Sequence, residues 1–274
     1  MRGPFVGEPS EESRQESALL FAAAEELSFL DGADCRKTPV LGSAALQRCD
    51  NCLGTMRPLA PEVLKTSKHV LRIDPAVASA VAALENDPFY ISICGGYVHV
   101  PVRRREVLTQ YFAYSIQEGK DIGRCVHLAD RTLGVAVWLL PQAPDVRSCA
   151  AHNKRVLLES TLDAEGCANY YRIVSFMRAK AANVVDDDAW YLSIVAVDPT
   201  AQGQGFGPKL LEPTLAEADR VNATCYLETF SPRNLSFYER LGFSTKARFT
   251  EPTTGADYTL MVRHPHALTE NSVP

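Results

Sequence analysis

The sequence of 274 residues lacks long hydrophobic runs and an excess of basic charge. No window approaches the ~18 consecutive apolar residues of a membrane-spanning helix, and the N-terminal MRGPFVGEPSEESRQES lacks the basic-then-apolar order of a secretory signal. The formal net charge of -5 argues against a broad basic surface for nucleic-acid phosphates. We therefore expect an intracellular, cytoplasmic protein with no membrane or nucleic-acid partner.

Regularly spaced metal ligands are also scarce. Of the eight cysteines, only Cys49 and Cys52 have the C-x-x-C spacing of a zinc or redox site. No second pair and no His-x-x-x-His follows at the separations that such sites use. We expect reduced thiols and no bound metal, with a site at Cys49 and Cys52 as the alternative.

Two common phosphate-binding motifs are missing. The sequence contains no G-x-x-x-x-G-K-[ST] loop, and its most glycine-rich stretch has the spacing G-x-G-x-G, where a dinucleotide site needs G-x-G-x-x-G. ATP and NAD are therefore poor candidates for the ligand.

The apolar residues that are present, 46% of the chain, suffice for a sizeable core but are unevenly distributed. Residues 1–66 have little regular periodicity, and we expect an appended arm that is flexible or partly helical. Residues 67–274 have the texture of one folded domain.

Alternating and helical patterns in the domain predict a mixed α/β sheet. We expect helices from Pro75, at 105–119 ending at Gly119, at 145–182 with a break at Gly166, at 206–222 and at 234–241. We expect strands at 69–73, 190–197, 224–230, 243–249 and 257–263, and a hairpin within 124–140. The strand at 190–197, WYLSIVAV, is apolar on both faces, as in the middle of a covered sheet.

The stretch VDPTAQGQGFGPKLL places three glycines between this strand and a helix. Free backbone N–H groups at the positive end of a helix form an anion site that suits phosphates. The alternative is a turn that only reverses the chain. Pro213 lies inside the helix that follows and removes one interior hydrogen bond.

The motif Gln202-x-x-Gly205-x-Gly207, followed by Asn234, Tyr238 and FYERLGF, resembles the acetyl-CoA-binding core of the GNAT superfamily of N-acetyltransferases. Within that family, the stretches WYLSIVAVDPTAQGQGFGPKLLEPTLAEADRV and CYLETFSPRNLSFYERLGF are most similar to the puromycin N-acetyltransferase branch. The resemblance is strong over 188–263, fair over 75–141 and weak over 142–187.

The resemblance implies a mixed, mostly antiparallel central sheet flanked by helices, with a V-shaped splay between strands 190–197 and 224–229. Acetyl-CoA would lie in this splay as co-substrate. The residues implied to bind it are Val195, Ala196, Val197, Gln202, Gly203, Gln204, Gly205, Phe206, Gly207 and Asn234. Gln204 stands where the family usually has a basic residue, so backbone donors would carry more of the phosphate binding.

Acetyl transfer needs an amine without its extra proton, donors for the developing oxyanion and a proton for the leaving thiolate. Tyr238 has the position of the family's general acid; alternatively, its ring only packs against the sheet. Glu228, at a strand end near the splay, is the candidate general base or a solvated carboxylate. A backbone N–H of 193–195 would bind the oxyanion.

Asn234 has two interpretations that can both hold, and two further groups are weaker candidates. Asn234 is a natural helix N-cap as well as a cofactor contact. His99 and His127 lie in β-like stretches and are more simply packed or exposed than catalytic. Arg103, Arg104 and Arg105 are most simply a solvated basic face.

The sequence thus predicts an acetyl-CoA-dependent N-acetyltransferase that acts on a primary amine of a small molecule, by direct transfer. A role in antibiotic or toxin detoxification or self-protection follows only from similarity to the puromycin branch. The alternatives are a protein lysine or N-terminal acetyltransferase, and a non-catalytic acyl-CoA-binding module.

Overall fold

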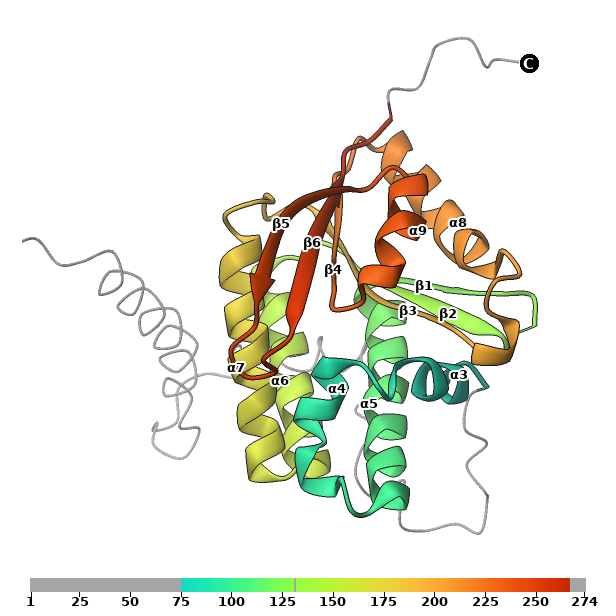
Figure 1. Cartoon of the computed structure of the whole chain (residues 1–274). Helices are drawn as coiled ribbons and strands as arrows, with labels where there is room; N and C mark the ends of the chain where they lie inside the picture. The colour runs from blue at the N-terminus through green and yellow to red at the C-terminus, as the bar shows by residue number, and fades with distance from the viewer. Residues whose placement is uncertain (1–74, 131, 267–274) are drawn as a thin grey trace, which may run out of the picture.

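One six-stranded sheet forms the centre of the molecule (Figure 1). The computed structural model describes residues 75–130 and 132–266. The expected arm at 1–66, the expected strand at 69–73 and the pair Cys49 and Cys52 lie outside these residues. In the described part of the chain, no helix combines the length and apolar character that crossing a membrane requires.

The strand order is β1-β2-β3-β4-β6-β5, and every neighbouring pair is antiparallel except β3 and β4. The strands are β1 (Gly123–His127), β2 (Gly134–Leu139), β3 (Trp190–Val197), β4 (Cys225–Thr229), β5 (Ser244–Thr250) and β6 (Asp257–Arg263). This confirms the predicted mixed, mostly antiparallel sheet.

Helices cover both faces of the sheet (Figure 1). The first face carries α3 (Pro75–Leu84), α4 (Pro88–Ile93), α5 (Pro101–Ile122), α6 (Pro144–Thr161) and α7 (Ala164–Ala181). The second face carries α8 (Phe206–Arg220) and α9 (Leu235–Arg240). The described residues also contain the short 3₁₀ turns η2 (Gly95–Tyr97), η3 (Pro199–Ala201) and η4 (Pro232–Asn234).

Two expected helix boundaries are wrong. The helix expected to stop at Gly119 continues to Ile122, and Gly119 is a packing position, because a Cβ there would come within 2.5 Å of Val137. The region 145–182 does contain two helices, but the break falls before Asp163, which caps α7 by accepting a hydrogen bond from the N–H of Gly166.

The helix α4 was not expected from its apolar sequence PFYISI. Asp87 accepts a hydrogen bond from the N–H of Phe89 (3.0 Å), and Pro88 occupies the first helical position. A capping side chain and a proline with a helical φ start a helix even where β-branched and aromatic residues follow.

The two faces of the sheet carry separate hydrophobic clusters. Side chains of β3 alternate between buried and half-buried, and both kinds contact a helical layer. Ile194 and Ala196 pack with α3, α4, α5 and α7, whereas Trp190 and Leu192 pack with α8 and α9. This agrees with the prediction of a strand that is apolar on both faces.

The parallel pair β3 and β4 is hydrogen-bonded only where both strands begin. Its register contains two residue pairs, Trp190 with Cys225 and Tyr191 with Tyr226. Beyond them β3 stays paired to β2 as far as Val197, and β4 stays paired to β6 as far as Thr229. The two strands therefore separate toward their C-terminal ends, which is the predicted V-shaped splay.

A buried ion pair joins α8 to the end of β6. Arg263, with 4% of its side chain exposed, donates two hydrogen bonds to Asp219 (2.7 and 2.6 Å) and a third to the carbonyl of Leu241 (3.0 Å). Asp219 also accepts from the backbone N–H of His266 (2.8 Å). Asp219 thus neutralises the positive charge of Arg263, and the carbonyl of Leu241 accepts a further hydrogen bond from its guanidinium.

We predict that Asp219→Asn lowers the free energy of unfolding by about 3–5 kcal/mol, because it leaves a buried guanidinium without its counter-charge. Urea denaturation monitored by fluorescence measures the change. The matched control is Asp186→Asn, in the exposed loop before β3, which should shift stability by less than about 0.5 kcal/mol. Equal effects of the two substitutions would contradict a special role for the ion pair.

Candidate active site

Two glycines give the turn after β3 its shape. Gly203 and Gly205 have φ angles of +78° and +77°, in the left-handed region that other residues avoid. Neither is packed: a Cβ at either position would meet no atom within 4 Å. The backbone conformation, rather than lack of space, therefore requires glycine at these two positions.

The third glycine has a different role. A Cβ at Gly207 would come within 2.9 Å of the ring of Phe237, so this glycine lets α8 lie close to α9. Gly205 is the N-cap of α8 and offers no side-chain cap, which leaves the first N–H groups of the helix available to a ligand. Lys209, exposed in the first turn, has its ammonium 5.4 Å from the ring centroid of Phe206.

Polar side chains hold the turn in place from within. Asp198 accepts hydrogen bonds from the N–H and hydroxyl of Thr200 (2.9 and 2.5 Å). Gln202 donates to the carbonyl of Val197 (3.1 Å), and Gln204 donates to the carbonyl of Thr200 (3.3 Å). Both predicted glutamines thus bond to the turn itself, which presets its backbone before any ligand arrives.

A β-bulge in β3 lies beside the splay. Val137 of β2 is opposite Ile194, and the next residue, Trp138, is opposite Leu192, so Ser193 is an extra residue without a partner. An extra residue reverses the side to which the following backbone groups point. Before the bulge, the even-numbered residues of β3 direct their backbone N–H and C=O groups toward β4. After it, the odd-numbered residues do so.

The backbone of Val195 and Val197 faces the open side of β3. Asp198 donates its N–H to Leu133 on the β2 side (2.9 Å), and backbone groups alternate sides along a strand. Val195 and Val197 consequently point toward β4, where no pairing continues at this level. Ala196, also predicted to bind the cofactor, pairs with β2 and buries its side chain.

Glu228 is half-buried on the first face of the sheet, and its Oε1 atom is out of contact with solvent, so it is not a freely solvated carboxylate. It is opposite Leu260 of β6, and Tyr191 donates a hydrogen bond to it across the beginning of the splay. Its Oε1 atom is buried without a hydrogen-bond partner among the described residues. Burial raises the pKa of Glu228 from 4.5 to about 7.

Tyr238 lies on the second face, in α9. Its ring packs against Phe237 and Phe243, with centroid distances of 4.9 and 6.0 Å, and its exposed fraction is 8%. Burial, and then the nearby charge of Asp87, raise the pKa of Tyr238 above its usual value. The hydroxyl therefore holds its proton at neutral pH, so the packed ring is compatible with a proton donor.

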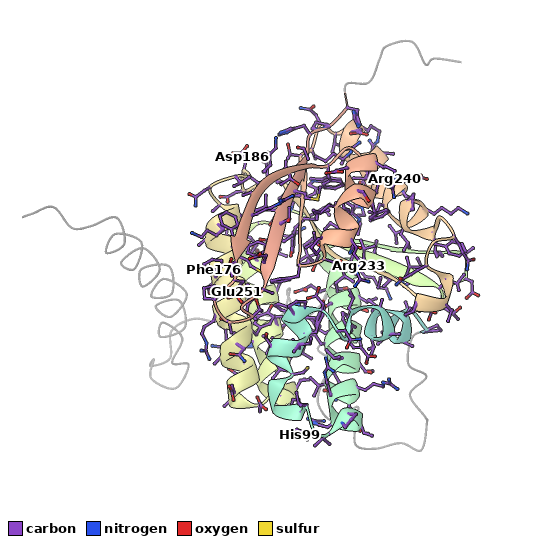
Figure 2. The ribbon with its side chains drawn as sticks, viewed as in Figure 1. His99, Phe176, Asp186, Arg233, Arg240 and Glu251 are labelled. Carbon is purple, nitrogen blue, oxygen red and sulfur yellow. The ribbon has the colours of Figure 1, made fainter. Side chains whose placement is uncertain are left out.

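The remaining predicted residues take various places. Asn234 is exposed and is the N-cap residue of α9, as predicted, but its side chain makes no capping hydrogen bond. Figure 2 shows the neighbouring Arg233 at the end of α9 that faces α3 and α4. His99 is exposed at the far end of the helical layer (Figure 2). His127 lies in the edge strand β1, next to Cys125.

Arg103, Arg104 and Arg105 are not simply a solvated face. Arg104 donates to the carbonyl of Glu85, and Arg105 lies 3.9 Å from the carboxylate of Glu85. Arg103 pairs with Glu106 (3.3 Å). Arg104 and Arg105 thus link the loop between α3 and α4 to the start of α5, whereas Arg103 pairs within α5.

Sequence reasoning missed three residues near the splay: Asp87, Tyr191 and Lys209. The dipeptide Asp87-Pro88 is a helix-start signal of the same kind as Asp74-Pro75 at the start of α3, so the sequence alone could have predicted a helix there. Lys209 follows the glycine turn directly and offers the cationic charge that Gln204 does not. No local signal marks Tyr191, because its bond to Glu228 forms between separate strands.

Within residues 75–130 and 132–266, no group of three or more His, Cys, Asp or Glu side chains could hold a metal ion. No disulfide joins two of the five cysteines in these ranges: Cys94, Cys125, Cys149, Cys167 and Cys225.

Comparison with known proteins agrees with this arrangement. Residues 168–245 match the family described as the acetyltransferase (GNAT) domain. A Schizosaccharomyces pombe protein described as an uncharacterized N-acetyltransferase is 25% identical over 197 residues, which are 69% of this chain and 78% of that protein.

Two solved structures are similar over most of the chain. A Corynebacterium glutamicum protein, described as histone acetyltransferase HPA2 and related acetyltransferase, is 24% identical with a TM-score of 0.48, covering 71% of this chain and 91% of that chain. A mosquito protein, described as arylalkylamine N-acetyltransferase like 5b, is 16% identical with a TM-score of 0.45, covering 69% of this chain and 93% of that chain.

The range matched by the family runs from α7 through β3, the glycine turn, β4 and α9. The chain therefore carries an acetyltransferase domain of the GNAT type, and it is an acyltransferase. The reading as a non-catalytic binding module is set aside.

The raised pKa of Glu228 predicts how stability depends on pH. The folded-state pKa of about 7 exceeds the unfolded value of 4.5, so the stability linked to this group is complete below pH 4.5 and is lost as the pH rises to about 7. Glu228→Gln should therefore become more stable than the wild type across this window, by at most about 3 kcal/mol above pH 7.

Melting temperatures from pH 4.5 to pH 8.5 measure this difference. Glu239→Gln, on the exposed face of α9, is the control and should follow the wild type throughout. A difference between Glu228→Gln and the wild type that does not change with pH would contradict the burial of an ionisable carboxyl group.

Proposed function

We propose that this acetyltransferase transfers the acetyl group of acetyl-CoA to a primary amine of a small molecule. One observation carries the proposal: the strands β3 and β4 separate between a half-buried carboxylate, Glu228, on one face and a buried phenol, Tyr238, on the other. A base and an acid on opposite sides of one opening are what transfer between two substrates requires.

The residues of the splay fit acetyl-CoA. The backbone groups of Val195 and Val197 would pair with the amides of the pantetheine arm, as a strand edge pairs with an extended ligand. The amides from Gln202 to Gly207 would bind the pyrophosphate at the N-terminus of α8. Lys209 would add a positive charge there, and Asn234 would contact the arm.

Bound acetyl-CoA supplies the acetyl group as a thioester. Glu228 would accept a proton from the attacking amine, and a pKa near 7 lets it do so at neutral pH. A backbone N–H of 193–195 would bind the thioester oxygen as negative charge develops there. Tyr238 would donate its proton to the sulfur that leaves.

The surroundings of Glu228 support a small acceptor over a peptide. The first face of the sheet is covered by α3, α4, α5 and α7. Rings of Phe89, Tyr90, Tyr111 and Tyr170 pack together between these helices, at centroid distances from 5.1 to 6.4 Å. A detoxifying or self-protective role accords with the resemblance to the puromycin branch. The alternative acceptor is a protein lysine or N-terminus.

Release of free thiol from acetyl-CoA tests the proposal. The acceptor panel contains puromycin, 2-phenylethylamine, spermidine, and peptides with a free lysine or N-terminus. We expect release with at least one small amine, and kcat for that amine should fall about 100-fold in Tyr238→Phe, because the leaving thiolate loses its proton donor.

Binding measurements complete this test. The affinity of Tyr238→Phe for acetyl-CoA should stay within twofold of the wild type, and Tyr97→Phe, in the distant turn η2, should keep full activity. Release with peptides alone would transfer the proposal to a protein acceptor. No release with any acceptor would refute the transfer to small amines.

The glycine turn predicts a selective loss of cofactor binding. Gly205→Ala forces a side chain into the left-handed region at a cost of about 1–2 kcal/mol, so the Kd for acetyl-CoA should rise about tenfold. Isothermal titration calorimetry measures it. Gly255→Ala is the matched control, because Gly255 has φ +65° and equally open surroundings but lies in the β5–β6 loop. The control should bind acetyl-CoA normally.

A further inference from the structure

Two buried polar atoms on the first face of the sheet have no hydrogen-bond partner among the described residues: Oε1 of Glu228 and the hydroxyl of Tyr258. Leaving one such group unpaired costs about 1–3 kcal/mol. Buried polar groups in folded proteins are nearly always satisfied, so two orphans on one face point to a missing polar partner.

The two side chains are close neighbours in the sheet. Glu228 is opposite Leu260 in the antiparallel pair of β4 and β6, and Tyr258 lies two positions before Leu260 on the same face. Such diagonal neighbours are within reach of long side chains. The charge of Glu228 acts on Tyr258 and is, after burial, the main reason that the pKa of Tyr258 is raised.

The ring of Tyr258 is held firmly. It is 1% exposed and contacts the rings of Phe230, Phe249 and Phe176 at centroid distances of 5.5, 5.6 and 6.5 Å. A phenylalanine would fill this aromatic site equally well, so packing alone gives no reason for the hydroxyl.

The interaction with Tyr191 leaves one carboxylate oxygen of Glu228, Oε1, without a hydrogen-bond partner among the described residues. The hydroxyl of Tyr191 donates a hydrogen bond to the Glu228 carboxylate. The ring of Tyr226 stacks on the ring of Tyr191, with a distance of 4.8 Å between their centroids. The free carboxylate oxygen therefore remains for a donor from the acceptor substrate.

We propose that Glu228 Oε1 and the Tyr258 hydroxyl together bind the two N–H groups of the acceptor's primary amine. This inference rests on the proposed function and adds a specificity residue, Tyr258, to its site. A neutral primary amine uses its lone pair for attack and has two N–H groups left, one for each oxygen. A secondary amine has only one N–H, and its extra methyl group would meet the Tyr258 hydroxyl.

The proton and electron balance of the step is complete. The nitrogen lone pair forms the new bond to the acetyl carbon, and the carbon–sulfur bond breaks with its electron pair on sulfur. The N–H bonded to Glu228 gives its proton to Oε1, while the N–H bonded to Tyr258 is retained in the amide product. Tyr258 thus orients the amine and exchanges no proton, which separates its role from those of Glu228 and Tyr238.

The test compares Tyr258→Phe with the wild type on a primary amine and its N-methyl derivative. The primary amine is the acceptor with the highest rate in the panel above, and the derivative is made by chemical methylation. We expect kcat/KM of the variant to fall about tenfold for the primary amine and to change less than twofold for the N-methyl derivative. The preference for the primary amine should therefore fall about tenfold.

Tyr226→Phe is the control. Tyr226 lies on the same face of β4 as Glu228, but its hydroxyl is not among the buried groups that lack a hydrogen-bond partner. The preference of this variant for the primary amine should equal that of the wild type. Melting temperature and acetyl-CoA affinity verify that both variants fold. A preference of Tyr258→Phe within twofold of the wild type would overturn the inference while leaving the proposed function intact. Absence of transfer by the wild type would instead refute the proposed function, and this inference with it.

Discussion

The interrupted pairing of β3 and β4 is the constraint on which the rest of the site depends. A sheet normally satisfies every interior backbone group, yet these parallel strands share only the pairs at Trp190 and Tyr191. Continuous pairing with β2 and β6 on their outer sides keeps both strands in place. The extra residue at Ser193 then turns the backbone of Val195 and Val197 toward the opening. An edge that an extended ligand can pair with thus exists in the middle of the sheet.

At this opening, the two titratable groups Glu228 and Tyr238 lie on opposite faces of the sheet. Because side chains of a strand alternate, Glu228 of β4 lies with α3, α4, α5 and α7, while α9 brings Tyr238 to the other face. Burial acts on both groups in the same direction and raises both pKa values. The chemical outcome differs: Glu228 titrates near neutral pH, whereas Tyr238 keeps its proton. Burial thus makes Glu228 a candidate base at neutral pH, whereas Tyr238, the candidate acid, is protonated at neutral pH with or without burial.

The helical layer on the first face shows why sequence reasoning identified no acceptor side chains. Tyr90, Tyr111 and Tyr170 come from α4, α5 and α7, and each looks like an ordinary apolar position of its own helix. Only packing brings their rings together. Glu118 of α5 and the half-buried Lys154 of α6 likewise form an ion pair, 2.7 Å apart, that no local sequence pattern indicates. Contacts between separate helices leave no periodic trace along the chain.

The sequence by itself determined the order of the strands and of the helices other than α4 in the described residues, the glycine turn and the position of Tyr238, because period, turn residues and motif spacing are local properties. Tertiary structure decided that Gly119 and Gly207 are packing positions and that Glu228 is half-buried beside Tyr191 and Tyr258. The pKa of a carboxyl group depends on what surrounds it in space. For Glu228 those surroundings come from β3, β4 and β6, which are distant in the chain and adjacent only in the folded sheet.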